Sequence, residues 1–332
     1  MRGSLTLFSR CGRTIIFTLL AVFSLTLVGM MTPEFALAVE GKAQEPATVA
    51  TQMDAAFGTW QPPNELFPQD RHHVVVSTSI MLAIALGFMC IAAYDSRKFR
   101  SWVPIGMVLG AAFCVVPEAI DNYLGGVYWT QSHIPGDIMF VLMGREFDWY
   151  VAIMWWAFGA ILGYLLYAVL LRKVKTRTLW FCLLLSGIAD IVVEELLLGY
   201  GGIYTYYGNQ PLVLFRHFPC WWLFVNVASL FLSVSIAYRF RNWFNGWHSV
   251  FLLLLMPFCY MGGFAFCGMP AIFAINGIFS PFVTQLVGIV TCVVAMVMTG
   301  GTMYIVLGRN PFAMRQKAAA DVYMGSAGKA SL

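Results

Sequence analysis

The chain has 332 residues, of which 60% are hydrophobic and 11% are charged. A soluble domain carries about 25% charged residues, so this composition excludes a soluble enzyme and predicts a membrane protein. The net charge of +4 indicates no nucleic-acid partner, because the basic residues fall in short segments between apolar runs and form no stripe on a polar surface.

Residues 1–38 have the order of a secretory signal. Basic residues precede an apolar stretch at 15–28, and Ala36-Leu37-Ala38 follows it. A basic start, an apolar centre and small residues at a cleavage site define such a signal. The alternative is an uncleaved N-terminal anchor, which would be an eighth span at 15–33. The extracytoplasmic segment 39–72 is polar and has no periodicity, so we expect it to be irregular.

Seven further apolar runs are long enough to cross a bilayer, which takes about 20 residues in a helix. Because backbone groups in hydrocarbon must bond within their own segment, each run predicts a helix. The sequence therefore predicts an all-α, polytopic transmembrane bundle at residues 73–307, followed by a polar cytoplasmic tail at 308–332. The predicted spans are 74–94, 102–118, 149–171, 178–198, 220–238, 249–267 and 283–307.

The distribution of Lys and Arg predicts the orientation of this bundle. If the chain begins inside and each run crosses once, only Lys42, Arg71, Arg145 and Arg216 of its 20 basic residues lie outside. Cytoplasmic loops of membrane proteins carry such an excess of positive charge. We therefore expect a multi-pass protein of the bacterial cytoplasmic (inner) membrane, with its C-terminus in the cytoplasm.

The predicted spans 102–118 and 178–198 end in the same phrase, in which a glutamate is followed by two glycines, a β-branched residue, a tyrosine and a proline. Both copies end helices that run from inside to outside, so they predict a parallel internal repeat. Such repeats often place a site at their mutual interface, although Gly-Gly and Tyr are also common at helix ends by chance. The copies are Glu118, Gly125-Gly126-Val127-Tyr128, Pro135 and Glu194, Gly201-Gly202-Ile203-Tyr204, Pro211.

Four acids in or beside these spans are the candidate catalytic residues. Glu118 and Asp121 are three residues apart, and Asp190 and Glu194 are four apart, so each pair shares one helix face. An acid at mid-bilayer costs roughly 2.5–3.5 kcal/mol and usually faces a cavity or a partner. Desolvation and a nearby carboxylate favour the protonated form of a carboxyl group. We expect an acid/base site toward the extracytoplasmic side.

An aromatic and polar segment follows the second glutamate and predicts a substrate pocket. Its glycines permit close backbone approach, and its aromatic rings offer flat apolar surfaces with polar tips. We interpret it as a re-entrant lid over a lipophilic substrate, and we expect the amide of Asn226 to reach the carboxylates because it would be costly unpaired. The candidate substrate-binding residues are Tyr128, Tyr204, Tyr206, Tyr207, Gln210, Trp222 and Asn226.

Both groups of candidates also have a purely structural explanation. Acids at the interfacial end of a helix can be solvated, or can pair with Arg145 or Arg216. Trp and Tyr near the ends of spans commonly form a belt at the lipid headgroups. The sequence leaves these explanations open.

The sequence lacks the motifs of common cofactors and metals. None of its five histidines falls at mid-membrane, which argues against a bis-histidine haem or a di-iron site. It contains no phosphate-binding loop and no dinucleotide fingerprint. Most cysteines fall within spans, where they behave as small apolar residues, so we predict neither a disulfide nor a zinc site. With no cofactor and no metal predicted, the chemistry left for the four acids is proton transfer.

Three runs of residues form recognisable motifs. They are Pro117-Glu118-x2-Asp121-x2-Leu124-Gly125 with Tyr128; Asp190-x3-Glu194-x4-Gly199-x4-Tyr204-x-Tyr206-Tyr207-Gly208-x-Gln210-Pro211-Leu212; and Pro219-x-Trp221-Trp222-x3-Asn226. These runs resemble motifs of the AveC-like spirocyclase family, over residues 75–310. The resemblance implies a multi-span bacterial membrane protein that uses carboxylic acids and no redox cofactor to cyclise or dehydrate a polyketide- or isoprenoid-like substrate.

We therefore expect a cofactor-free cyclase, dehydratase or hydratase. Glu194, assisted by Asp190, is the expected acid, and Glu118 with Asp121 would stabilise a cation and take up a proton. The expected partners are a lipophilic small molecule and the lipid bilayer, and the oligomeric state is not predicted. Two alternatives remain, namely a proton-coupled transporter of small molecules or lipids, and a non-catalytic membrane subunit. Helices broken at mid-membrane would favour transport.

Overall fold

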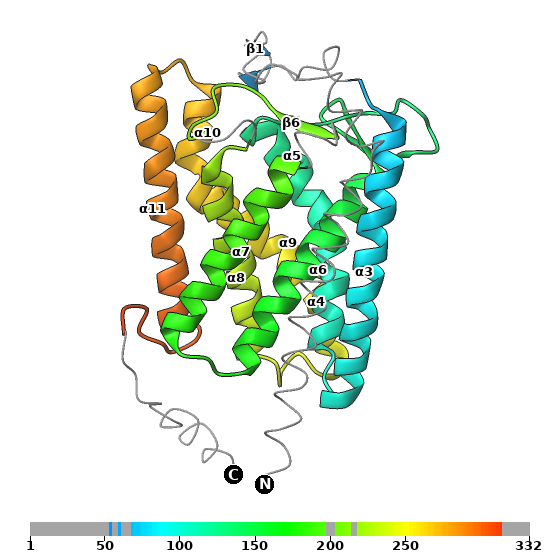
Figure 1. Cartoon of the computed structure of the whole chain (residues 1–332), viewed down its shortest axis with the longest axis vertical. Coiled ribbons are helices and arrows are strands. Elements are labelled where there is room, and N and C mark those ends of the chain that lie inside the picture. The colour runs from blue at the N-terminus through cyan, green and yellow to red at the C-terminus, as the bar shows by residue number, and fades with distance from the viewer. Residues whose placement is uncertain (1–52, 55–58, 61–67, 197–202, 214–217, 314–332) are drawn as a thin grey trace.

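The computed structural model describes residues 53–54, 59–60, 68–196, 203–213 and 218–313. These form a bundle of long helices with short strand pairs at one end, where α3 and α11 begin (Figure 1); we call this the ribbon end. The elements are β1 (Met53–Asp54), β2 (Thr59–Trp60), α3 (Arg71–Phe99), α4 (Val103–Ala111), η1 (Ala112–Cys114), α5 (Val115–Gly125), β3 (Val127–Trp129), β4 (Ile138–Leu142), β5 (Arg145–Asp148), α6 (Trp149–Leu171), α7 (Thr176–Leu196), β6 (Tyr204–Tyr206), α8 (Cys220–Arg239), η3 (Gly246–Phe251), α9 (Leu252–Gly263), η4 (Phe264–Gly268), α10 (Met269–Asn276) and α11 (Pro281–Ile305).

Seven helical segments are long and apolar enough to cross a membrane. Five are the single helices α3, α6, α7, α8 and α11. The other two combine α4 with α5 and α9 with α10, each through a short irregular turn. The predicted all-α bundle of seven spans is therefore confirmed, and the architecture is that of a multi-pass membrane protein. The predictions for residues 1–38 lie outside the described part of the chain, as does most of the predicted tail.

Three spans are longer than predicted. The first covers Arg71–Phe99, where we expected 74–94. The second continues to Gly125, where we expected an end at 118, and the sixth continues to Asn276, where we expected an end at 267. The polar residues from Glu118 onward suggested the end of a span, but in the bundle they are buried by neighbouring helices. Glu118 therefore lies about two helical turns before the end of its span, deeper than the sequence predicted.

Irregular turns interrupt the regular α-helix in the second and sixth spans, each just before a proline. A 3-10 turn, η1, precedes Pro117, and a π turn, η4, precedes Pro270. Proline has no N–H to donate and clashes with the carbonyl four residues earlier, so the backbone must adjust locally. The helix continues through both turns, and no described span contains an unwound segment.

At the ribbon end, two antiparallel strands join the helices that carry the repeated glutamates. β3 follows α5 after Gly126, whose φ of 64° is a conformation that glycine adopts without strain. β6 lies between α7 and α8 in the chain. The two copies of the repeated phrase thus pair with each other through their strands. The partners are Val127 with Tyr206, Tyr128 with Thr205, and Trp129 with Tyr204.

The core of the bundle lies around α4, α6 and α8, which are the most buried spans, whereas α3, α7 and α11 are peripheral. Glycines on α4 allow α9 to approach closely. The backbone oxygen of Leu252, the first residue of α9, lies so near Gly110 that an added Cβ would be 2.6 Å from it. This contact depends on the absence of a side chain at Gly110.

The close approach of α4 and α9 predicts the effect of a methyl group at this position. The Gly110→Ala variant should lose about 1–3 kcal/mol of stability, as is typical of overpacking, because a backbone oxygen cannot rotate away. The apparent melting temperature in detergent measures the loss. Gly87→Ala on α3 is the matched control, since its added Cβ meets nothing within 4 Å. Equal melting temperatures for the two variants would contradict the packing.

Candidate active site

A cavity between the bundle helices and the ribbon is lined by both repeated glutamates. The space open to the centre of a water molecule is about 50 Å³, which admits several waters, since one needs roughly 10–15 Å³. Seven of its fourteen lining residues are aromatic, and none is basic. Besides Glu118 and Glu194, the lining consists of Met81, Val127, Trp129, Met154, Trp155, Phe158, Val193, Tyr204, Tyr206, Trp222, Asn226 and Tyr260.

Glu118, on α5, is held by donors at both carboxyl oxygens. The ring nitrogen of Trp129 donates to Oε1 at 3.0 Å, and the hydroxyl of Tyr260 donates to Oε2 at 2.9 Å. When the amide of Asn122 is turned so that both its ends are satisfied, it also donates to Oε1, at 2.7 Å. These contacts fix a buried carboxyl group and surround it with hydrogen-bond donors.

Glu194, on α7, has donors at one oxygen only. The hydroxyls of Tyr204 and Tyr206 both donate to Oε2, the second at 3.4 Å. Burial, and then the neighbouring Glu194, raise the pKa of both tyrosines well above the usual value, so their hydroxyls remain protonated donors. Among the described residues no group donates to Oε1 of Glu194. That oxygen is the unbonded one of the four in the two glutamates.

The structure brings the two glutamates together through the ribbon. Trp129, which bonds Glu118, stacks on Tyr204, which bonds Glu194, with ring centroids 4.4 Å apart. Both glutamates line the same cavity. Each glutamate is therefore held by a strand from its own copy of the repeat, and the copies meet at the cavity.

The two aspartates among the candidate catalytic residues do not line the cavity. Asp121 lies about one turn beyond Glu118 and is fully buried, and neither carboxyl oxygen makes a hydrogen bond to a described residue. Asp190 lies about one turn before Glu194 and is also buried, with Asn226 as its polar neighbour. Each aspartate shares a helix face with its glutamate, as predicted, but sits behind it.

The candidate substrate-binding residues divide into two groups. Tyr204, Tyr206, Trp222 and Asn226 line the cavity, and Tyr128, Tyr207 and Gln210 do not. Successive side chains of a strand point to opposite faces, so Thr205 and Tyr207 point away from the cavity that Tyr204 and Tyr206 face. Tyr128 pairs with Thr205 and lies on the same outer face of the ribbon.

Arg145 occupies that outer face and pairs with none of the acids among the described residues. It donates to the hydroxyl of Tyr207 and to the backbone oxygens of Asn122 and Val127, at 3.4 and 3.3 Å. Its guanidinium also lies 4.1 Å from the ring centroid of Tyr123. The suggestion that Arg145 neutralises the acids is wrong, because its two terminal nitrogens donate to backbone carbonyls and to the hydroxyl of Tyr207. The alternative partner, Arg216, lies outside the described residues.

Sequence reasoning missed the three other cavity residues that combine an aromatic ring with a hydrogen-bond donor, namely Trp129, Trp155 and Tyr260. In a single apolar sequence, aromatic residues are normally assigned to the packed core or to the belt at the lipid headgroups. One signal was available for Tyr260, because a buried tyrosine hydroxyl usually finds a hydrogen-bond partner and an apolar span offers few. Its partner is Glu118, 142 positions earlier in the chain.

Within the described ranges, no three residues of the types His, Cys, Asp and Glu gather to hold a metal ion. Comparison of the chain with models of known protein families, with curated proteins and with solved structures gives no match. The resemblance to spirocyclases therefore rests on the motif residues alone. The fold and the site define a helical multi-pass membrane protein with an acidic, aromatic cavity at its ribbon end.

Gln210 contributes to this site as a clamp outside the cavity. Its side-chain nitrogen donates to the backbone oxygens of Gly125, Gly126 and Tyr207, at 2.7, 3.3 and 2.9 Å. It thereby ties the end of α5 to the chain beyond β6. The carbonyls at the end of a helix lack partners within the helix, so Gln210 supplies a donor that the backbone cannot.

The clamp predicts the effect of removing that donor. Gln210→Met keeps the side-chain length but leaves buried carbonyls unsatisfied, which should cost about 1–3 kcal/mol and lower the apparent melting temperature. Gln285→Met is the matched control, because exposed Gln285 only accepts one hydrogen bond, from the backbone nitrogen of Leu212. A Gln210→Met protein as stable as the Gln285→Met protein would refute the clamp.

Proposed function

We propose that the chain is a cofactor-free acid/base enzyme that cyclises, dehydrates or hydrates a lipophilic substrate within the membrane. The supporting observation is the unequal hydrogen bonding of two glutamates in one cavity. Glu118 has donors at both oxygens, whereas Glu194 keeps Oε1 free of described partners. An acid and a base that work together need such different environments.

The hydrogen bonds assign a role to each glutamate. Charge-assisted bonds from donors stabilise a carboxylate, so Glu118, with Trp129 and Tyr260 donating to it, is the base. Glu194 lines the cavity with one oxygen that has no donor among the described residues, and it is the acid. Asp121 and Asp190 stand behind the glutamates and act on the substrate only through them.

The proposed reaction begins when Glu194 gives its proton to an oxygen of the substrate. If that oxygen is a hydroxyl, its C–O bond breaks, water leaves and a cation remains. Ionised Glu118 stabilises the cation and takes a proton, either from the adjacent carbon to form a double bond or from a hydroxyl that has attacked to close a ring. The proton then returns from Glu118 to Glu194, and both groups are restored.

The cavity walls support this chemistry. Aromatic faces attract cations, and the seven aromatic residues surround the place where the cation would form. Positioned proton transfer contributes roughly 10²–10⁴-fold to a rate, and holding the substrate in a reactive shape contributes further. The absence of common cofactor motifs in the sequence agrees with a reaction of this type.

We also infer the setting of the site. The distribution of basic residues favours a bacterial cytoplasmic membrane, with the ribbon end and its acids toward the extracytoplasmic side. The lipid bilayer would then deliver a lipophilic substrate to the cavity. Fusing a reporter active only in the cytoplasm to residue 313 would test this orientation.

Proton-coupled transport is a second candidate, favoured by the small volume of the cavity. A space of about 50 Å³ holds water and protons more readily than a whole lipophilic molecule. Against transport, the described spans contain no unwound segment at mid-membrane. Uptake by reconstituted vesicles under a pH gradient, with no change in the chemistry of the solute, would support this candidate.

The acid role predicts the phenotype of Glu194→Gln. A deletion strain complemented with this variant should accumulate a lipophilic precursor that differs from the wild-type product by one water, or by no mass if the reaction is a cyclisation. Mass spectrometry of lipid extracts measures the change. Glu195→Gln is the matched control, because Glu195 accepts from the backbone nitrogen of Phe218 and does not line the cavity.

Expression and melting temperature of Glu194→Gln should stay close to those of wild type, because the amide still accepts from Tyr204 and Tyr206. A wild-type metabolite profile in the Glu194→Gln strain would sink the proposal.

The base role predicts a smaller effect for Tyr260→Phe. A hydrogen bond to a charged group contributes about 1.5–3 kcal/mol, so losing the donor at Oε2 of Glu118 should slow turnover roughly 10–100-fold. Tyr164→Phe is the matched control, since Tyr164 also donates to a carboxylate, that of Asp95, away from the cavity. Equal turnover in the two variants would argue against Glu118 as the base.

A further inference from the structure

Among the described residues that line the cavity, three have a buried polar atom without a hydrogen-bond partner in the described part of the chain, namely the ring nitrogens of Trp155 and Trp222 and Oδ1 of Asn226. The last two belong to the same helix, α8. Their side chains are only 2% and 5% exposed, and both line the cavity. Buried polar groups are nearly always hydrogen-bonded, so a pair of orphans beside a catalytic acid indicates a place for a ligand.

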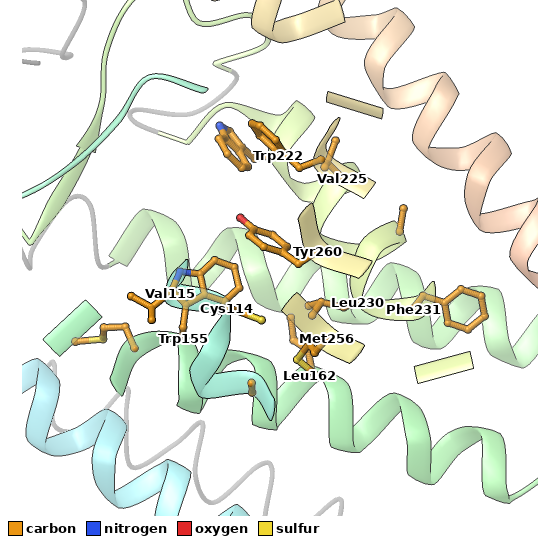
Figure 2. Close-up of a cluster of buried hydrophobic side chains, with 14 of the residues drawn as sticks. Cys114, Val115, Trp155, Leu162, Trp222, Val225, Leu230, Phe231, Met256 and Tyr260 are labelled. Carbon is orange, nitrogen blue, oxygen red and sulfur yellow. The ribbon is translucent and has the colours of Figure 1, made fainter. Parts of the chain in front are cut away.

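The two residues lie on the same helix and line the same cavity. Trp222 and Asn226 are four residues apart on α8, so they share one face of that helix. Asp190 is the polar neighbour of Asn226; a carboxyl group attracts the amide nitrogen and leaves Oδ1 for the cavity. Figure 2 shows the ring nitrogen of Trp222 on the same side of the apolar cluster as the hydroxyl of Tyr260. Both polar atoms thus border the cavity that contains Glu194.

The chemistry of the pair restricts the ligand. An indole nitrogen can only donate, and an amide oxygen can only accept. A ligand that satisfies both must accept and donate at one position. A hydroxyl does so, whereas an ether or a carbonyl only accepts and an ammonium only donates.

We propose that the substrate is a lipophilic alcohol whose hydroxyl oxygen accepts from Trp222 Nε1 and whose hydroxyl hydrogen is donated to Asn226 Oδ1, within reach of Glu194. This inference rests on the proposed function and narrows it, because the substrate then enters as an alcohol and loses or transfers that hydroxyl. Trp222 and Asn226 become the residues that select an alcohol over a carbonyl compound of the same size.

The test measures binding to the purified full-length protein in nanodiscs. Tritiated farnesol, an isoprenoid alcohol, is displaced either by unlabelled farnesol or by farnesal, its aldehyde, which can accept but cannot donate. Wild-type protein should prefer the alcohol by roughly tenfold or more, because a site built to hydrogen-bond a substrate rejects an analogue that leaves its polar groups unpaired.

Two variants separate the contributions. Asn226→Leu should abolish the preference, because it lowers the affinity for the alcohol and leaves the affinity for the aldehyde unchanged. Trp222→Phe keeps an aromatic ring but loses the N–H donor. It should therefore lower the affinity for both ligands, because both accept a hydrogen bond from that donor. Trp247→Phe, which changes an exposed tryptophan outside the cavity lining, should bind both like wild type.

Equal binding of alcohol and aldehyde to the wild-type protein would overturn the inference. Trp222 Nε1 and Asn226 Oδ1 would then be assigned to hydrogen bonds with water. Binding of neither compound, or a preference that survives Asn226→Leu, would overturn it as well. Because this assay needs no turnover, its result is independent of the Glu194→Gln metabolite profile. A normal profile together with a clear alcohol preference would refute the enzyme and leave the alcohol site standing.

Discussion

The antiparallel pairing of β3 with β6 is the constraint on which the site depends. α5 and α7 belong to separate parts of the chain, and the paired strands join their ends. The flanking bond from the Tyr207 nitrogen to the Gly126 oxygen, 2.8 Å long, extends this pairing. Because the side chains of each strand alternate, the register that joins the helices also decides which rings reach Glu118 and Glu194. A slip of one residue would exchange the inner and outer faces of a strand.

The second requirement is to bury two carboxyl groups in an apolar cavity. None of the described residues that line the cavity is Lys, Arg or His, and the nearby Arg145 is engaged on the outer face of the ribbon. The described donors to the two glutamates come instead from aromatic side chains, which supply a polar tip and an apolar wall together. The composition of the cavity therefore suits proton transfer.

The sequence predicted the spans well because every backbone group in hydrocarbon must bond within its own segment, and this makes length and apolarity sufficient signals. It located Glu118 and Glu194 because an acid in an apolar span is conspicuous. It failed where tertiary structure overrides composition. The polar run after Glu118 indicates the end of a span when only the sequence is considered. In the structure, the surrounding helices bury this run and the span continues.

The sequence could not separate the candidate substrate-binding residues that line the cavity from those that do not, and the physical reason is a different one. Tyr207 and Gln210 belong to the same aromatic segment as Tyr204 and Tyr206, and only a strand assignment separates their faces. A strand of three residues is too short for the alternation of inward and outward side chains to be recognised from the sequence. Tyr260 was missed because its partner lies far away in the chain, and no local pattern records such a contact.

The repeated phrase is informative in its departure from symmetry. Its two tyrosines occupy matching positions in the sequence, yet Tyr204 faces the cavity and Tyr128 faces outward, because Tyr204 pairs with Trp129 and Tyr128 pairs with the next residue, Thr205. A strict repeat would give both glutamates the same donors and hence similar acidity, and two equal acids cannot divide the roles of acid and base. The offset of one residue gives Glu118 an indole donor and gives Glu194 phenol donors. Duplication brings the two carboxyl groups together, and the imperfect register makes them chemically different.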